Sequence, residues 1–130
     1  ENLGVISYSP LGGGLLTGRY TEDIKASTGR LVENKTYQAR YEGPHYRRIA
    51  TDFTRLAQER GLCPASLAVA WVASNPIITA PIIGAANTTQ LKDSLASLEI
   101  SIDAQLKAEF DGISSPPPPA TDRSEELKAR

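Results

Sequence analysis

Apolar and polar positions divide the first half of the chain into a strand, a long polar segment and an amphipathic helix. Gly4–Tyr8 is a short run with β-branched residues that Pro10 and three glycines terminate, so it predicts a strand. Residues 15–44 are polar, contain glycines and show little periodicity, which is typical of a functional loop. From Tyr46 onward, apolar residues recur at helical spacing until Gly61, where a left-handed residue would end the helix.

The next segment predicts a buried helix followed by a second strand. The helix begins at Pro64, closes at Asn75 and has no polar face, so it is expected to be buried. Thr79–Ile83 has the composition of a strand, in which Pro81 fits best near the start. Gly84 ends this strand.

Two amphipathic helices follow the second strand. Asn87, Thr88 or Thr89 supplies the N-cap of the first, and Gln90 is placed as the capping-box partner of Asn87. Its apolar stripe is formed by Leu91, Leu95 and Leu98. The second helix begins at Asp103 as N-cap. Its apolar face is formed by Leu106, Phe110 and Ile113.

The order of these elements predicts an α/β fold. Two strands, each followed by a helix, have the pattern of parallel βα units, and such strands need neighbours on both edges and cover on both faces. A closed (β/α)8 barrel takes about 250 residues. We therefore expect residues 1–114 to be the C-terminal portion of a TIM barrel, incomplete in this chain, with the missing strands N-terminal to Glu1. The absence of any methionine fits a fragment, and residues 115–130 predict a proline-rich solvated tail.

Composition and charge exclude several classes of partner. The chain has 130 residues, 40% of them apolar and 22% charged, with a net charge of −1, as in one soluble globular domain. Its fourteen basic residues are scattered among fifteen acidic ones, so neither a nucleic-acid nor a membrane partner is expected. The single cysteine, Cys63, cannot form an internal disulfide, which indicates a reducing compartment, the cytoplasm.

Candidate chemistry lies directly after each predicted strand. In a barrel, active-site loops follow the C-terminal ends of the strands, and phosphate is frequently held after the last two. The glycines of "SPLGGG" leave room for backbone N–H groups to turn toward an anion. The segment "GAANTTQ" opens a helix whose N-terminus presents free N–H groups. Neither segment is a GxGxxG motif or a P-loop, and a glycine turn can also be purely structural.

Four ordered segments closely resemble the C-terminal part of the aldo-keto reductases, in particular the branch that includes the potassium-channel β subunits. These segments are "ISYSPLGGGLLTGRY", "TGRL", "PASLAVAWV" and "PIIGAANTTQLKDSL". The resemblance runs from about Leu3 to about Ser114. It implies a TIM barrel with NADPH extended across its C-terminal face.

The resemblance also implies a cofactor contact for each matching residue. Tyr8 corresponds to the aromatic residue that stacks on the nicotinamide ring. The ribose and pyrophosphate would lie along Ser9, Pro10, Leu11, Gly12 and Gly13. Arg19 takes the place of a basic residue near the pyrophosphate, and Arg30 that of an arginine in the loop over the cofactor. The adenine and the 2′-phosphate would lie near Gly84, Ala86, Gln90, Asp93 and Ser94.

Two of these positions depart from the family pattern. Ala86 stands where Ser, Arg or Lys commonly reaches the 2′-phosphate, and Ser94 stands where Asn is common. Loss of one such charge-assisted contact costs about 1.5–3 kcal/mol. NADP is the expected cofactor, NAD stays open, and Asn87 or Thr88 are alternative contacts.

The residues that would protonate a carbonyl substrate are absent from the chain. The family uses Tyr and Lys with Asp and His from the first half of the barrel, and none of the motifs that carry them occurs here. His45 ends the polar loop, and Cys63 precedes a helix start where the dipole activates a thiol mildly; both have simpler structural roles. No lysine is placed to lower the pKa of a loop tyrosine, so we assign no catalytic residue.

Three hypotheses about function follow. The first is the cofactor-binding portion of an NADP(H)-dependent reductase of aldehydes or ketones, inactive without its N-terminal half. The second is a non-catalytic, nucleotide-sensing regulatory module that acts through a protein partner. The third is a gene fragment that does not fold, with the apolar helix from Pro64 exposed. The carbonyl substrate itself is not readable from the sequence.

Overall fold

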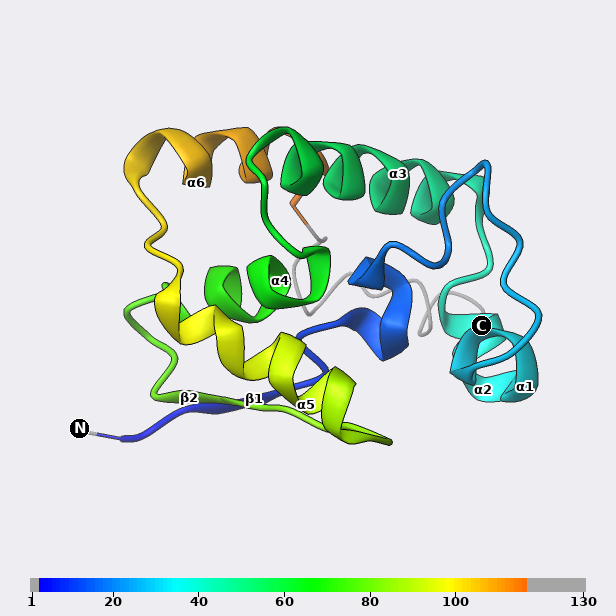
Figure 1. Ribbon diagram of the computed structural model, residues 1–130, viewed down its shortest axis with the longest axis horizontal. Helices are drawn as coiled ribbons and strands as arrows, with labels where there is room; N and C mark the ends of the chain where they lie inside the picture. Colours follow the sequence, from blue (N-terminus) through cyan, green and yellow to red (C-terminus); the bar gives the residue numbers. More distant parts are fainter. Residues whose placement is uncertain (1–2, 117–130) are drawn as a thin grey trace, which may run out of the picture.

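Two short parallel strands lie along one side of the molecule (Figure 1). The computed structural model describes residues 3–116. β1 (Ile6–Tyr8) pairs in parallel with β2 (Ala80–Ile82), with Tyr8 opposite Ile82. The predicted parallel pair is thus confirmed, although each strand is shorter than predicted. Each has only one neighbouring strand among the described residues.

Pro81 lies in the middle of β2 and not at its start, which corrects the sequence prediction. It is opposite Ser7 of β1. A proline has no N–H to donate, and it is tolerated here because each strand of a two-stranded sheet has an unpaired edge.

Two long helices form the centre of the fold. α3 (Pro44–Glu59) begins two residues before the predicted Tyr46, because Pro44 occupies the first turn, where its missing N–H costs nothing. Gly61 has φ of +66°, which confirms the predicted left-handed end of this helix. α4 (Pro64–Ala73) is buried along most of its length, as its continuous apolar sequence predicted.

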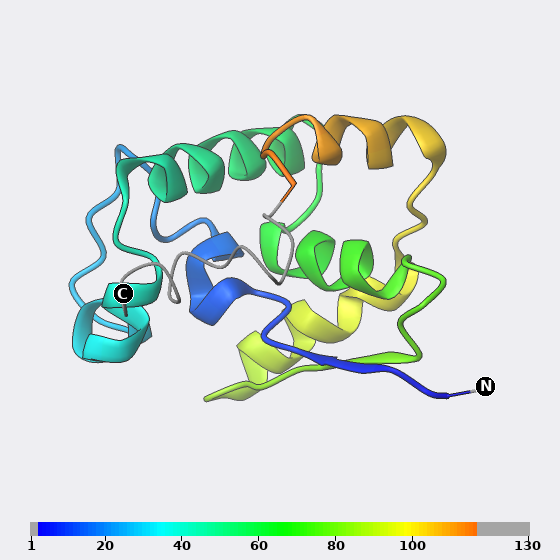
Figure 2. The same ribbon diagram turned by 180° about the vertical axis from the view of Figure 1, so that it is seen from behind.

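The helices and the sheet are stacked in layers. α4 lies between α3 on one side and the two strands on the other, and both views show this order (Figures 1 and 2). The main core lies where α3 and α4 meet α6 (Ala104–Asp111). Its buried members are Phe53, Ala57, Leu67, Ala68, Leu106 and Phe110. The rings of Phe53 and Phe110 are 5.3 Å apart between centroids.

Side-chain caps fix the starts of the last two helices. α5 (Thr88–Leu95) begins after Asn87, whose Oδ1 accepts a hydrogen bond from the N–H of Gln90 at 3.0 Å. The Gln90 side chain accepts in turn from the N–H of Ala86 at 2.9 Å, one residue before the position that a capping box uses. α5 continues into the 3₁₀ helix η2 (Ala96–Glu99). Asp103 caps α6 as predicted, accepting from the N–H of Leu106 at 2.7 Å.

The prediction of an unstructured loop over residues 15–44 was wrong in part. The segment contains the end of the 3₁₀ helix η1 (Gly12–Thr17) and two short helices, α1 (Arg30–Glu33) and α2 (Lys35–Arg40). Asn34 caps α2 by accepting from the backbone N–H groups of the second and third helical residues. Helices of this length contain fewer than two turns, too few for an amphipathic repeat to be recognised, so the hydrophobic pattern did not predict them.

Two apolar surfaces remain open in the described part of the chain. Ile6, Tyr8 and Ile82 project from one face of the sheet and are 64%, 74% and 55% exposed. The predicted stripe of Leu91, Leu95 and Leu98 also lies at the surface, with Leu98 81% exposed. Parallel sheets are normally covered on both faces, so the open sheet face has the character of a surface that packs against further structure.

Two further findings concern segments of the chain. Within residues 3–116, no helix is both long enough and apolar enough to span a bilayer. The prediction of a solvated tail falls mostly on residues 117–130, which lie outside the described residues.

Candidate functional site

The C-terminal ends of the two strands bring the two candidate loops to one edge of the molecule. Because β1 and β2 run parallel, the segment that leaves Tyr8 and the segment that leaves Ile82 start side by side. The first becomes the glycine turn (residues 9–14) and the second leads through Gly84 to the start of α5. In Figure 1 both segments, together with η1, lie toward the side of the molecule that carries α1 and α2. The strand geometry therefore starts both loops at the same edge of the molecule.

The glycine turn has an unusual backbone. Ser9 has φ of +56°, and Gly12, Gly13 and Gly14 have φ of +57°, +69° and +106°. These values fall in the region that favours glycine, which explains why three glycines stand in a row. The N–H of Gly12 donates to the carbonyl of Ser9 at 2.9 Å, and that of Gly14 donates to the carbonyl of Leu11 at 3.0 Å. Those two N–H groups are therefore satisfied within the turn.

Two tyrosines of the α2 region cover the glycines. A Cβ added at Gly13 would lie 2.5 Å from Cδ1 of Tyr37, and a Cβ at Gly12 would lie 3.5 Å from the hydroxyl of Tyr41. The sequence reasoning assigned the room at Gly13 to a phosphate, but in this structure an aromatic ring occupies it. The glycine turn thus packs against the Tyr37 ring of α2. An anion would have to approach from another side of the turn.

The two arginines of the candidate site lie in one connected loop. Arg19 donates from Nη2 to the side-chain oxygen of Thr28 at 3.2 Å and to its carbonyl at 3.4 Å. Arg30 follows two residues later and stands over the Tyr37 ring, with its guanidinium carbon 5.7 Å from the ring centroid. Arg40 approaches the same ring at 5.6 Å. Tyr37 thus links Arg30 to the glycine turn, whereas Arg19 is held by Thr28 within its own loop.

These arginines leave a net positive charge on the loop. Within residues 3–116, the ion pairs involve Arg55, Arg60 and Lys107, so neither Arg19 nor Arg30 is paired with a carboxylate. A guanidinium group presents several N–H donors in a fixed fork that matches phosphate oxygens. The loop therefore has the donors and the charge to bind a phosphate group.

Sequence reasoning missed Tyr37 and Arg40. Tyr37 lies three residues before Arg40 in α2, which is the helical spacing of side chains on one face. Asn34 carries the N-cap signal that marks the start of this helix. Arg30 belongs to α1, on the other side of the extended Asn34, so its approach to the Tyr37 ring follows from tertiary packing and not from sequence spacing.

The second half of the candidate site is the start of α5. Gly84, Ala86 and Gln90 are exposed, so a ligand has access to them. Asp93 holds α5 against α4, because its carbonyl accepts a hydrogen bond from the hydroxyl of Ser66 at 2.6 Å. Ser94 is only 2% exposed. Ser94 thus lies beneath the surface that the other residues present.

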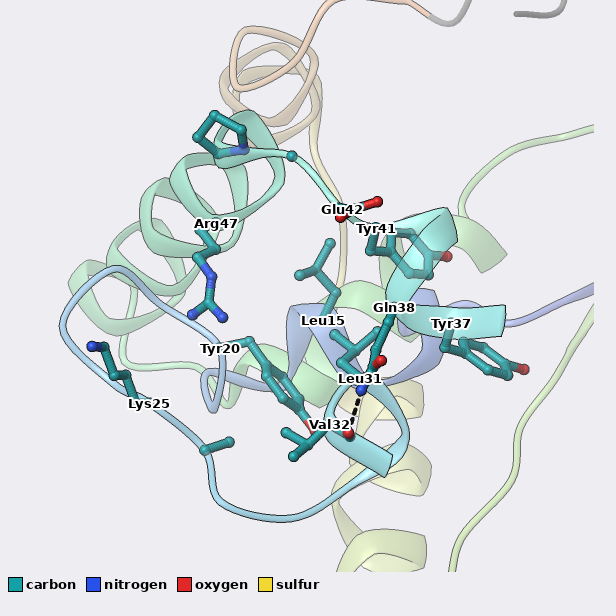
Figure 3. A pocket seen from close by; sticks show the side chains of 13 residues that line it. Leu15, Tyr20, Lys25, Leu31, Val32, Tyr37, Gln38, Tyr41, Glu42 and Arg47 are labelled. Atoms are coloured by element: carbon teal, nitrogen blue, oxygen red, sulfur yellow. Dashed lines mark hydrogen bonds between the residues drawn. The ribbon is translucent and has the colours of Figure 1, made fainter. Parts of the chain in front are cut away.

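A cavity of about 690 Å³ adjoins the loop (Figure 3). Leu15 and Tyr20 line its buried side, and Arg47 of α3 points into it. Tyr41 also lines the cavity, and burial raises the pKa of its phenol above the ordinary value of 10.0, against the opposing effect of the nearby Arg40 charge. Tyr37 contributes to the wall, but its ring points away from the cavity (Figure 3).

We predict that Tyr41 ionises at a higher pH than an exposed tyrosine. Because its pKa is raised on folding, the stability that the neutral phenol contributes is complete below pH 10.0 and declines as the pH rises through the folded value. Absorbance at the wavelength of tyrosinate, recorded through an alkaline titration, should show one late component that disappears in Tyr41→Phe. A late component that persists in this variant would assign the shift to another tyrosine.

The remaining candidate residues have structural surroundings. His45 packs against Tyr46 with 4.0 Å between ring centroids, and Cys63 is an exposed free thiol before α4. In the described part of the chain, no three His, Cys, Asp or Glu side chains are grouped so that they could hold a metal ion.

Comparison with known proteins gives a consistent set of similarities. The model of the aldo/keto reductase family matches residues 1–115. The chain is 36% identical over 104 residues to "Uncharacterized oxidoreductase YrpG" of Bacillus subtilis, which covers 80% of this chain and 30% of that protein. It is 29% identical over 113 residues to "Protein tas" of Escherichia coli, an alignment that covers 87% of this chain and 32% of that protein. It is 31% identical over 108 residues to "Probable voltage-gated potassium channel subunit beta" of Arabidopsis thaliana, an alignment that covers 77% of this chain and 31% of that protein. The chain thus spans about a third of the length of these relatives.

Proposed function

This chain belongs to the aldo/keto reductase family, and on that premise we propose that it is the nicotinamide-dinucleotide-binding portion of an oxidoreductase that reduces aldehydes or ketones. The observation that carries the proposal is the pair of loops that leave adjacent parallel strand ends. One loop carries two arginines that have no carboxylate partner within residues 3–116, and the other leads to an exposed helix start.

We assign the parts of the nucleotide along this edge. Tyr8 is 74% exposed at the end of β1, so its ring is free to stack on a nicotinamide. The pyrophosphate would be held by the segment from Ser9 to Gly13 and by Arg19 and Arg30, the latter two through charge-assisted hydrogen bonds. The adenosine end would lie at the start of α5, near Gly84, Ala86, Gln90 and Asp93. Ser94 would contact the adenosine only if its side chain became uncovered.

The residues present fit such a group in chemistry and in access. The unpaired arginines of the loop supply positive charge, and the exposed N-terminus of α5 supplies a favourable dipole end. A bound reduced nicotinamide supplies a hydride to the carbonyl carbon of the substrate. The acid that protonates the oxygen, and the Lys, Asp and His that accompany it in the family, would come from outside this chain. We therefore expect this chain alone to bind nucleotide without reducing carbonyls.

The same proposal extends to the fold and the compartment. We propose that β1 and β2 are two of the eight parallel strands of a TIM barrel. The exposed side chains of Ile6 and Ile82 support this, because a barrel interior would cover them. The single cysteine and the family as a whole favour the cytoplasm.

A second candidate function is a nucleotide-sensing regulatory module without catalysis. The observation in its favour is the similarity to a relative named as a probable channel β subunit. The two functions share the nucleotide site and differ in the N-terminal half. An intact set of catalytic Tyr, Lys, Asp and His residues upstream of this chain would favour the enzyme.

Fluorescence titration with NADPH, and with NADH in parallel, tests the nucleotide site. We predict saturable binding and about 10- to 150-fold weaker binding by Arg30→Ala, because removal of one charge-assisted hydrogen bond costs about 1.5–3 kcal/mol. Arg55→Ala is the matched control, since Arg55 is paired with Asp52 on α3 and should bind as the unchanged chain does. Equal affinity of the Arg30 and Arg55 variants would contradict the assignment. The ratio of NADPH to NADH affinity shows whether Ala86 has cost the chain its preference for NADP.

A further inference from the structure

Tyr37 connects the glycine turn with the cationic loop. Its ring packs on Gly13, where no side chain larger than hydrogen fits without displacing it. The same ring lies 5.7 Å from the guanidinium carbon of Arg30. A guanidinium over an aromatic ring at this distance is attracted by the ring quadrupole. Tyr37 is thus the side chain that touches both the turn and the arginine.

The surrounding segment holds this ring in place. Asn34 accepts hydrogen bonds from the N–H groups of Thr36 and Tyr37, which fixes the first turn of α2. The side chain of Gln38 donates to the carbonyl of Val32 and so ties α2 back to α1. Arg30 begins α1. The arginine and the ring therefore belong to one cross-linked pair of short helices.

Without the ring, Arg30 would have little to restrain it. Arg30 is exposed and has no carboxylate partner among the described residues. A long side chain of this kind loses substantial rotamer entropy when a ligand fixes it, and a partner that fixes it beforehand reduces that loss. The Tyr37 ring is the described group that can act in this way.

We infer that Tyr37 is a positioning residue, which holds Arg30 beside the glycine turn in the orientation that binds the nucleotide phosphate. This inference rests on the proposed function. It requires that the contribution of Tyr37 to binding pass through Arg30. The phenol hydroxyl is not needed, because ring carbons make the contact with Gly13 and the ring as a whole attracts the Arg30 guanidinium.

A double-mutant cycle on nucleotide affinity tests this in the full chain, with NADPH as the probe. Tyr37→Leu removes the aromatic face but keeps an apolar side chain, and should weaken binding about two- to fivefold, the equivalent of one exposed cation–π contact. Tyr37→Phe keeps the ring and should bind as the unchanged chain does. In the Arg30→Ala background, Tyr37→Leu should cause no further loss.

A second measurement reports the contact without any nucleotide. The NMR signal of the Arg30 Nε–H group should be shifted by the ring current, keep its position in Tyr37→Phe and move in Tyr37→Leu. Circular dichroism and the melting temperature of each variant show that it is folded.

The outcomes separate the two proposals. If Arg30→Ala weakens binding but Tyr37→Leu does not, the inference is overturned and the nucleotide site stands. The inference is also overturned if Tyr37→Leu weakens binding equally with and without Arg30, since the ring would then act directly. If the chain binds no nucleotide, the proposed function fails. In that case an unchanged Arg30 signal in Tyr37→Leu would overturn the contact as well, whereas a moved signal would support it.

Discussion

Replacing Leu67 with alanine is expected to lower the free energy of unfolding by about 2–5 kcal/mol, the range for a leucine removed from a packed core. Leu67 is 0% exposed on α4 and packs in the cluster that joins this helix to α3 and α6. The truncation removes the favourable free energy of transferring the lost methyl groups from water to the core. It also leaves a cavity, which the surrounding helices fill only in part. Because whole domains are stable by only about 5–15 kcal/mol, this variant should lose a large fraction of its stability.

Urea denaturation followed by circular dichroism measures this effect, with Leu98→Ala as the matched control. Leu98 undergoes the same chemical change at 81% exposure, so its replacement should alter stability by no more than about 0.5 kcal/mol. Similar losses in the two variants would show that the described core does not hold the chain together.

Replacing Gly29 with alanine is expected to cost about 2–4 kcal/mol, from backbone strain and from one lost hydrogen bond. Gly29 has φ of +113° and ψ of +171°, a region that is essentially restricted to glycine. An added Cβ would also clash with the hydroxyl of Tyr20, which donates to the carbonyl of Thr28 at 3.2 Å. Tyr20 is buried in the second apolar cluster, so it has little room to move away.

Gly61→Ala separates the two causes. Gly61 also has a positive φ, +66°, but nothing lies within 4 Å of an added Cβ. Its replacement should cost about 1–2 kcal/mol, the price of a left-handed conformation alone. In thermal unfolding, the melting temperature of Gly29→Ala should therefore be well below that of Gly61→Ala. Equal melting temperatures would mean that Tyr20 moves away from the added Cβ without a loss of stability.

The sequence predicted those parts of the fold that depend on local signals. α3, α5 and α6 followed from helical spacing and from caps such as Asp103, whose side chain does bond the N–H of Leu106. The parallel strands followed from their short apolar runs. α1 and α2 did not follow from the hydrophobic pattern, because four or six residues contain fewer than two helical turns. The exposure of the stripe that ends at Leu98 depends on what packs against it, which no local pattern contains.

The candidate site was likewise predictable from the sequence only in part. The meeting of the two strand ends was predictable, since parallel strands place their C-terminal ends together. The contact of Tyr37 with Gly13 joins segments 24 positions apart, and three glycines in a row signal only that space is needed there. What fills that space is decided by tertiary packing. The burial of Ser94 likewise depends on how α5 lies against α4.

The pairing of β1 with β2 has a thermodynamic consequence for any ligand of this edge. The N–H of Val5 donates to the hydroxyl of Thr79 at 2.9 Å across 74 positions, so the strands meet only after a long stretch of chain has been closed. The entropy of that closure opposes folding, although it grows only with the logarithm of the length. A molecule that binds the joined ends and not the separated ones stabilises the closed form in proportion to the logarithm of its concentration. If a dinucleotide contacts both strand ends as proposed, it would act as a reversible cross-link, and its concentration would set the fraction of time that β1 and β2 remain paired.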